Sequence, residues 1–211
     1  TLSIVPAEEI ITEDGKPGPR QGLFHVREYL ASLGIPVENL TFVDGYGEHP
    51  NINKWNQNHT GRTSSFGVTV PETGRIVIVA NNPANLSEFN PIKTGVHEGG
   101  HWLFLNTNGL WGKMLNALAD DGFDNLIVNA AGIYAQGNYG KSYGAKTSKK
   151  HVEEVICDIF AQKTRAKVKG LGLELARDTV PRVIEENVPS FDRAAYDELM
   201  RNAERLYPDP T

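Results

Sequence analysis

The strongest pattern in the chain lies in one stretch, Thr94-Gly95-Val96-His97-Glu98-Gly99-Gly100-His101-Trp102-Leu103. It contains the spacing His-Glu-x-x-His, formed by His97, Glu98 and His101. On an α-helix, positions i and i+4 share one face about one turn apart, so the two imidazoles can bind one metal ion. Zinc takes such nitrogen ligands at about 2.0–2.1 Å. Glu98 can then reach a metal-bound water as a general base.

A chance match is the first alternative, together with a pair of ordinary helix histidines. A random chain of this composition contains the pattern about 0.01 times, which argues against coincidence. The flanking residues also favour a helix, because Asn90-Pro91 is a suitable N-cap followed by proline at the first helical position. Ile92, Val96 and Leu103 add apolar positions around the motif. We therefore expect a buried central helix from Pro91 to Leu105.

Two adjacent glycines, Gly99 and Gly100, lie inside the expected helix. Each costs about 1 kcal/mol relative to alanine in a helix interior. A sequence that retains both indicates a close approach by another backbone or by a substrate. The alternative is a helix that is merely weak.

Composition and charge restrict the class of protein. At 211 residues, with 39% hydrophobic and 22% charged residues, the chain matches one globular domain over 1–211. We expect a β-containing part to about residue 90 and a helical part from about residue 91. The net charge of −5 is a poor match to the phosphate backbone, so we expect no nucleic-acid partner.

Membrane and disulfide signals are weak in this sequence. No run of 18 apolar residues and no signal-peptide layout occurs, so we expect no membrane segment and either a cytoplasmic or a processed, secreted protein. Cys157 is the single cysteine, which excludes an intrachain disulfide and a cysteine-rich structural zinc site. We interpret Cys157 as a small apolar residue on a buried helix face.

Secondary-structure signals divide at the motif helix. Before it, Leu40–Val43 is a predicted strand, and Ser65–Val70 with Arg75–Ala80 forms a predicted hairpin around Pro71-Glu72-Thr73-Gly74. Residues 137–148 read as a loop. His49 and His59 have no partner at ligand spacing and are interpreted as loop histidines. Helices are predicted at Leu23–Leu33, Leu110–Ala119, Asn125–Ala135, Ser148–Val168, Leu171–Val180 and Phe191–Tyr207.

The third metal ligand must come from downstream, because a catalytic zinc has three protein ligands and one open position. A metzincin would place a third histidine at position 107, which is Thr107, so that subclass is excluded. Glu154 and Asp158 share one face of the predicted Ser148–Val168 helix and interrupt an otherwise apolar stripe. Buried carboxylates are costly unless they are paired or bind a metal.

This pattern indicates that Glu154 is the third zinc ligand. Asp158 would then accept the free N–H of a ligand histidine and fix its tautomer. One alternative places both carboxylates on a polar face. Glu153 and His151 are the rival third ligands, although Glu153 shares a face with Cys157 and lysines and is expected to be exposed.

His97-Glu98-x-x-His101 followed by Glu154-x-x-x-Asp158 resembles the gluzincin branch of zinc metallopeptidases. The run from Glu154 to Ala161 is similar to the ligand helix of the ImmA/IrrE family. The resemblance implies an α+β, zincin-like fold with a small twisted β-sheet packed on the central helix and a mostly helical C-terminal half. It also implies an edge strand along the cleft, for which Ile76–Ala80 is the candidate. An extended peptide would add to that edge.

Gluzincin-like sites often hold a tyrosine or histidine that stabilises the oxyanion. The resemblance makes Tyr139 and Tyr143 candidates by position, and the alternative is that both tyrosines simply pack. We therefore expect a zinc metalloendopeptidase with one catalytic Zn²⁺ and a peptide or protein substrate. The alternatives are a zincin-fold binding or regulatory module without turnover, and a zinc ion that is only structural.

Overall fold

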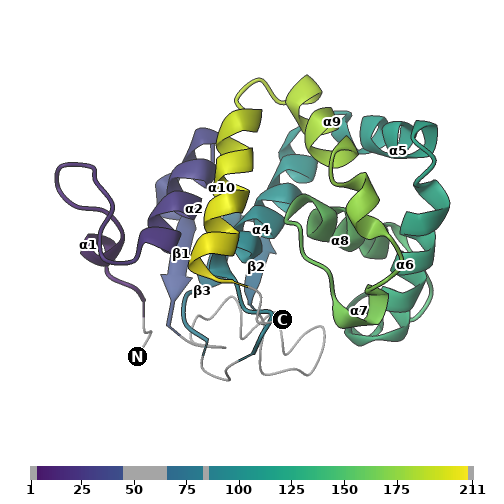
Figure 1. Cartoon of the computed structure of the whole chain (residues 1–211), viewed down its shortest axis with the longest axis horizontal. Coiled ribbons are helices and arrows are strands. Elements are labelled where there is room, and N and C mark those ends of the chain that lie inside the picture. The colour runs from purple at the N-terminus through teal and green to yellow at the C-terminus, as the bar shows by residue number, and fades with distance from the viewer. Residues whose placement is uncertain (1–3, 45–65, 83–85, 209–211) are drawn as a thin grey trace. The chain divides into compact units, whose positions relative to one another are not determined.

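A computed structural model describes residues 4–44, 66–82 and 86–208. Over these residues the chain is a mixed α+β protein, mostly helical, with a small three-stranded sheet, as predicted. It divides into two compact units (Figure 1). The sheet unit comprises Thr1–Gly99 and Ala194–Thr211, and the helical unit comprises Gly100–Arg193. The division falls inside the motif helix, and the last residues of the chain belong to the sheet unit.

The sheet has the strand order β1-β3-β2. Strand β1 (Leu40–Val43) runs parallel to β3 (Arg75–Val79), whereas β2 (Gly67–Val70) runs antiparallel to it. The predicted hairpin is therefore confirmed, and Gly74 takes a φ of 71° in its turn, a conformation that glycine adopts without strain.

The expectation that Ile76–Ala80 is an edge strand is wrong. Strand β3 pairs on both sides, and its Ile76, Val77, Ile78 and Val79 are each at most 1% exposed. A continuous run of buried β-branched residues is typical of a central strand that is covered on both faces. Among the described residues, β2 pairs only with β3 and is the edge strand on that side.

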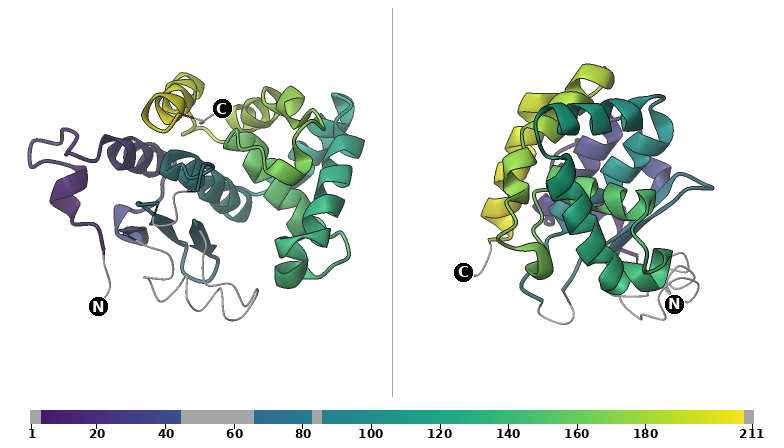
Figure 2. Two further views of the ribbon diagram at one scale, coloured as in Figure 1. Left: turned by 60° about the horizontal axis from the view of Figure 1, so that its bottom comes forward. Right: turned by 90° about the vertical axis from the view of Figure 1, so that its right-hand side faces the viewer.

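Two helices cover one face of this sheet in the sheet unit. Helix α2 (Gln21–Ser32) and the first part of α4 (Pro91–Asn106) lie along the same side of the strands (Figure 2). Asn90 is the N-cap of α4, as predicted, because its Oδ1 accepts the Lys93 N–H at 3.2 Å. Two short helices, α1 (Ala7–Ile10) and the 3₁₀ turn η1 (Val37–Asn39), complete the N-terminal region.

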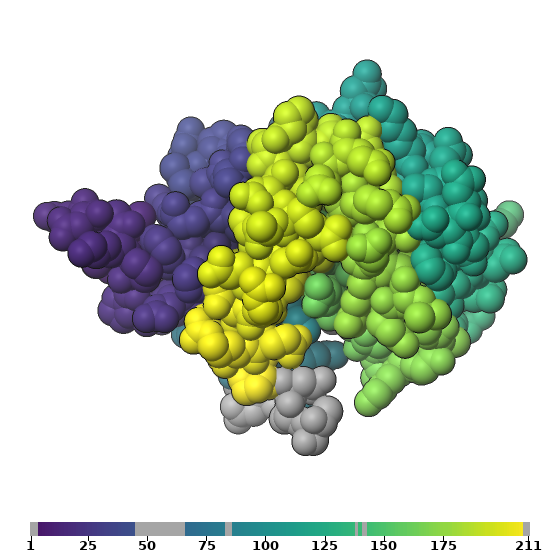
Figure 3. Space-filling model, turned by 45° about the horizontal axis from the view of Figure 1, so that its top comes forward, coloured from purple at the N-terminus to yellow at the C-terminus, as the bar shows by residue number. Residues whose placement is uncertain are grey.

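Helix α10 (Arg193–Leu206) brings the end of the chain back to the sheet unit. The Asn90 side-chain amide donates to the carbonyl of Ala203 at 3.1 Å, so one residue caps α4 and holds α10 against it. Figure 3 shows α10 at the surface beside α2. The sheet unit is thus closed by residues more than 100 positions apart in the sequence.

Gly95 allows α4 to pack closely on α2. A Cβ atom there would collide with Cγ2 of Val26 and lie 3.2 Å from Ile78 Cδ1. Val26 is β-branched and fully buried, so its side chain has little freedom to move. Replacing Gly95 with alanine is expected to lower the free energy of unfolding by about 1–3 kcal/mol, the usual cost of overpacking a core. Urea denaturation of the purified protein measures the change.

Gly112 gives the matched control for this substitution. It lies inside helix α5 (Leu110–Asp120), and a Cβ there would meet nothing within 4 Å. Gly112→Ala is expected to raise the free energy of unfolding by about 0.5–1 kcal/mol, because only helix propensity changes. Equal effects of the two substitutions would contradict the proposed close packing at Gly95.

The helical unit is built around α8 (Lys149–Phe160). The side chains from Glu154 to Phe160 are all buried. Helices α6 and α9 contact α8, and α5 contacts α9 (Figure 2). The other elements of this unit are α6 (Asp124–Gln136), α7 (Asn138–Tyr143), η2 (Ala166–Val168), η3 (Leu173–Ala176) and α9 (Thr179–Asn187).

Three predicted elements of this unit differ in the structure. The expected loop at residues 137–148 contains α7, and the expected helix Leu171–Val180 is the 3₁₀ turn η3 followed by the start of α9. The expected helix to Val168 ends at Phe160. There Gln162 takes a φ of 55°, and the Lys163 N–H donates to the carbonyl of Asp158 at 2.8 Å, which reverses the chain.

Within the described residues, no helix combines the length and apolar character that a membrane crossing needs.

Candidate metal centre

Helix α4 gathers His97, Glu98 and His101 at one place. One ligand atom from each residue lies within 4.8 Å of the others. His97 and Glu98 are buried, at 7% and 6% exposed, and His101 is partly buried. The one-turn spacing of the motif produces this grouping directly. These three side chains could hold a metal ion.

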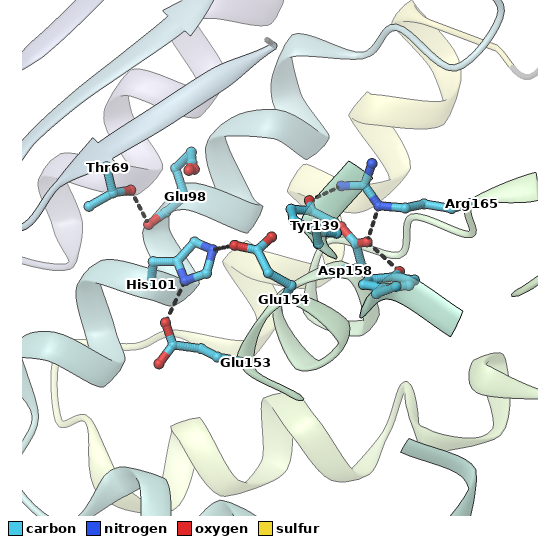
Figure 4. A network of polar contacts seen from close by, with 9 residues as sticks. Thr69, Glu98, His101, Tyr139, Glu153, Glu154, Asp158 and Arg165 are labelled. Carbon is cyan, nitrogen blue, oxygen red and sulfur yellow. Dashed lines mark hydrogen bonds and ion pairs between the residues drawn. The ribbon is translucent and has the colours of Figure 1, made fainter. Parts of the chain in front are cut away.

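His101 lies between two carboxylates of α8 in the helical unit (Figure 4). Its Nε2 is 2.9 Å from Oε1 of Glu154, and its Nδ1 is 2.6 Å from Oε2 of Glu153. A carboxylate at one ring nitrogen fixes the tautomer and the orientation of the ring, so that the other nitrogen faces the metal. The structure therefore aims Nε2 of His101 and the Glu154 carboxylate toward each other.

The distance between these two groups fits a shared metal ion. Nitrogen and oxygen ligands about 2.0–2.1 Å from zinc lie about 3.3 Å apart at tetrahedral angles. The 2.9 Å separation of His101 Nε2 and Glu154 Oε1 is a direct contact, and a metal ion held by both groups would require it to widen by a few tenths of an ångström. The donor types, imidazole nitrogen and carboxylate oxygen, are those that zinc uses in catalytic sites.

The surroundings of His101 also set its protonation. Burial lowers the pKa of the imidazole, but the neighbouring Cys157, Glu154 and Glu153 together raise it well above the ordinary value. Both ring nitrogens then donate to carboxylates in the metal-free chain. A metal ion bound at Nε2 would have to displace that proton, so its affinity would fall as the pH is lowered.

Asp158 has different partners from those expected. It is 1% exposed, and its Oδ2 accepts from the Tyr134 hydroxyl and from Nε of Arg165, both at 2.6 Å. Both Glu153 and Glu154 contact the motif histidine His101, and Glu153, which was expected to be exposed, has a side chain that is 25% exposed. The contact with a ligand histidine that was expected for Asp158 is made by Glu153 at Nδ1 of His101. It agrees in placing Glu154 inward.

His151, the other rival ligand, caps its own helix. Its Nδ1 accepts the Ser148 N–H at 3.0 Å, and its Nε2 lies 3.3 Å from the carbonyl of Tyr139. A carbonyl oxygen only accepts, so Nε2 carries the proton and Nδ1 is the acceptor. Both ring nitrogens of this fully buried residue are therefore used at the start of α8.

The two candidate tyrosines belong to one aromatic stack. The Tyr139 ring lies 5.4 Å from that of Tyr134 and 6.0 Å from that of Tyr143. Tyr143 also meets the edge of the His151 ring at 5.9 Å. The Tyr139 hydroxyl accepts from Nη2 of Arg165 at 2.6 Å. Tyr139 is thus held by Arg165, and Tyr143 packs against the capping residue His151.

Side chains from other helices pack closely against the two motif glycines. A Cβ at Gly99 would lie 2.8 Å from Cδ2 of Leu30, and one at Gly100 would lie 3.0 Å from Sγ of Cys157. The predicted close approach is therefore present, and its partners within the chain are side chains rather than a backbone. Cys157 is fully buried as expected, and burial raises the pKa of its thiol to about 12.

Sequence reasoning did not find Arg165. The predicted helix continued through it, which would have placed it far along the helix axis from Asp158. His49 and His59 lie outside the described residues, so the structure adds nothing to their interpretation.

Comparison with known proteins finds no matching family model, no matching curated protein and no matching solved structure.

Proposed function

We propose that this chain is a zinc-dependent metalloendopeptidase of the gluzincin type. The observation that carries the proposal is the His97, Glu98 and His101 group on one helix. Two imidazoles with an adjacent carboxylate are the residue types that metal-assisted peptide hydrolysis needs. The contact of Glu154 with Nε2 of His101 supports it by offering a third ligand of the expected type.

Each side chain has a distinct role in this proposal. His97, His101 and Glu154 hold the zinc ion, and Glu153 keeps the His101 ring oriented. When bound, zinc supplies Lewis-acid chemistry that makes water more acidic and polarises a carbonyl group. Glu98 takes a proton from the attacking water and later gives it to the leaving amine.

Strand β2 supports a peptide as the substrate. Thr69 on β2 donates its hydroxyl proton to the carbonyl of Glu98 at 3.1 Å, so this strand borders the motif within the sheet unit (Figure 4). Among the described residues β2 pairs only with β3. An extended peptide would bind its other side by main-chain hydrogen bonds, which makes β2, not β3, the proposed substrate strand.

Metal analysis combined with a peptidase assay tests this function. We expect one zinc ion per chain, and hydrolysis of a mixed peptide library that a chelator abolishes and added Zn²⁺ restores. Zinc bound at full occupancy without turnover would support the binding or regulatory module instead. Hydrolysis that survives complete removal of the metal would contradict the mechanism.

A further inference from the structure

Strand β2 meets the motif helix at two of its residues, Gly67 and Thr69. They are two positions apart and therefore lie on the same face of the strand. On helix α4, Thr94 and Glu98 are one turn apart and share a face. These two faces approach each other at both positions of the strand. All four residues belong to the sheet unit.

The absence of a side chain at Gly67 lets the strand lie close to α4. A Cβ atom there would be 2.7 Å from Cγ2 of Thr94, 3.1 Å from the carbonyl oxygen of Val77 and 3.3 Å from Cγ of Glu98. Thr94 has little freedom to move away, because it is β-branched, is 3% exposed and donates its hydroxyl proton to the carbonyl of Asn90 at 3.0 Å. A larger residue at position 67 must therefore push β2 and α4 apart.

The Thr69 hydroxyl joins the strand to Glu98 itself. Its Oγ1 donates to the main-chain carbonyl of Glu98 at 3.1 Å (Figure 4). The Glu98 side chain is buried, and its Cγ faces the position where Gly67 has no side chain. One residue of β2 thus holds the main chain of Glu98, and another leaves room for its side chain.

The spacing between β2 and Glu98 matters for the proposed reaction. A peptide bound along the other side of β2 would take its position from that strand. The attacking water would take its position from Glu98, because a general base must lie within hydrogen-bond reach of the proton that it removes. Strand and helix must therefore keep a fixed spacing, since a misplacement of about 1 Å can lower a rate about 10²-fold.

We propose that Gly67 and Thr69 are positioning residues that hold the general base Glu98 at a fixed distance from strand β2. This inference rests on the proposed function, because it concerns the base and the substrate strand of that reaction. It does not concern the spacing of His97 and His101, which both lie on α4 and are spaced by the helix itself. The role therefore predicts a lower kcat with zinc affinity and KM unaltered.

Gly67→Ala is the first test, read by kcat, by KM and by the zinc dissociation constant in competition with a chromophoric chelator. We expect kcat to fall about 10–100-fold, because the added methyl group separates β2 from α4. KM and zinc affinity should stay close to the wild-type values. A wild-type kcat would overturn the proposal. So would a loss of zinc that accounts for the whole loss of activity, since the substitution would then act on the metal site.

Thr69→Val is the second test, and it does not depend on the folding of the first variant. Valine keeps the shape of threonine but lacks the hydroxyl donor, so we expect kcat to fall about three- to ten-fold, as for one lost hydrogen bond. Thr69→Ser keeps the donor and should retain most of the wild-type kcat. Equal losses in the two variants, or no loss in Thr69→Val, would overturn the proposal.

A measurement on the metal-free protein tests the geometry without turnover. The ¹³C NMR signal of the Glu98 carboxylate can be identified by its absence from Glu98→Gln. We expect this signal to shift in Gly67→Ala and in Thr69→Val, because both substitutions move Glu98 relative to β2. A signal that stays in place in both variants would overturn the proposal.

Two control variants make the same chemical changes away from Glu98. Gly22→Ala adds a methyl group on α2 in the same unit, where a Cβ atom would lie 2.7 Å from the hydroxyl oxygen of Tyr207. Thr41→Val removes a hydroxyl from β1, which pairs with the opposite side of β3 from β2. Both controls should keep the wild-type kcat and the Glu98 signal. Losses of kcat as large as in the test variants would overturn the proposal, because general destabilisation would then explain them.

The positioning role and the peptidase function fail in different ways. If the wild-type protein cleaves peptides with zinc, and both Gly67→Ala and Thr69→Val keep its kcat, the positioning role fails alone. If the wild-type protein binds zinc but cleaves no peptide, the peptidase function fails, and the role of Glu98 as a positioned base fails with it.

Discussion

Replacing Glu98 with glutamine is expected to lower peptide hydrolysis by about 10²–10⁴-fold while zinc remains bound. Glutamine has nearly the same shape as glutamate, but its amide cannot take a proton from the attacking water. Glu98 is 6% exposed and lies next to His97 on α4, so a substitution of equal size preserves the packing around the motif. Elemental analysis gives the zinc content, and initial rates on a peptide library give the activity.

Glu185→Gln is the control for this experiment, since Glu185 is an exposed residue of α9. It makes the same chemical change away from the motif and should leave both zinc and rate unaltered. Full activity in Glu98→Gln would remove Glu98 from the mechanism. Loss of zinc together with activity would show that Glu98 acts through the metal site's structure instead.

The motif helix could be predicted because its signals are local. Asn90 and Pro91 mark its start, and apolar residues at helical spacing mark its buried side. The structure begins α4 at Pro91 and ends it at Asn106, one residue beyond the prediction. The hairpin was equally local, with Gly74 in the turn between two β-branched runs.

The roles of the α8 carboxylates could not be predicted from spacing. A period of 3.6 residues shows that Glu154 and Asp158 share a face, but it does not give the rotation of that face toward His101. Glu153 and Glu154 are offset by about 100° around α8, yet both reach the His101 ring, at Nδ1 and Nε2. That rotation depends on packing against α6 and α9, which is tertiary information.

The contact of Arg165 with Asp158 and the order of the strands could not be predicted from the sequence for a similar reason. Arg165 reaches Asp158 only because Gln162 adopts positive φ and reverses the chain, and a non-glycine residue gives little warning of that conformation. The central place of β3 depends on its parallel partner β1, which is more than 30 residues away in the sequence. The local β-branched pattern indicated a buried strand, and the resemblance to gluzincins incorrectly placed it at the edge.

Replacing His101 with alanine is expected to weaken zinc binding by more than about 100-fold, beyond the range seen when only a partner of a ligand is lost. The metal-free chain should also be less stable by about 1–3 kcal/mol, because the buried Glu154 loses a hydrogen bond. Isothermal titration with Zn²⁺ and urea denaturation of the metal-free protein measure the two effects.

The control is His25→Ala, which removes a histidine from α2 that packs on the Phe24 ring at 5.7 Å. It should leave zinc affinity unchanged.

The pH dependence adds a second check on His101→Ala. The pKa of folded His101 lies above the ordinary 6.5, so its stabilising contribution is complete below that pH and disappears as the pH rises through the folded value. In the metal-free state, the excess in free energy of unfolding of the wild type over His101→Ala (its stability advantage) should therefore shrink at alkaline pH. In excess zinc it should instead grow, because the imidazole then binds metal. An advantage that falls with pH in both conditions would show that His101 holds a proton but no metal.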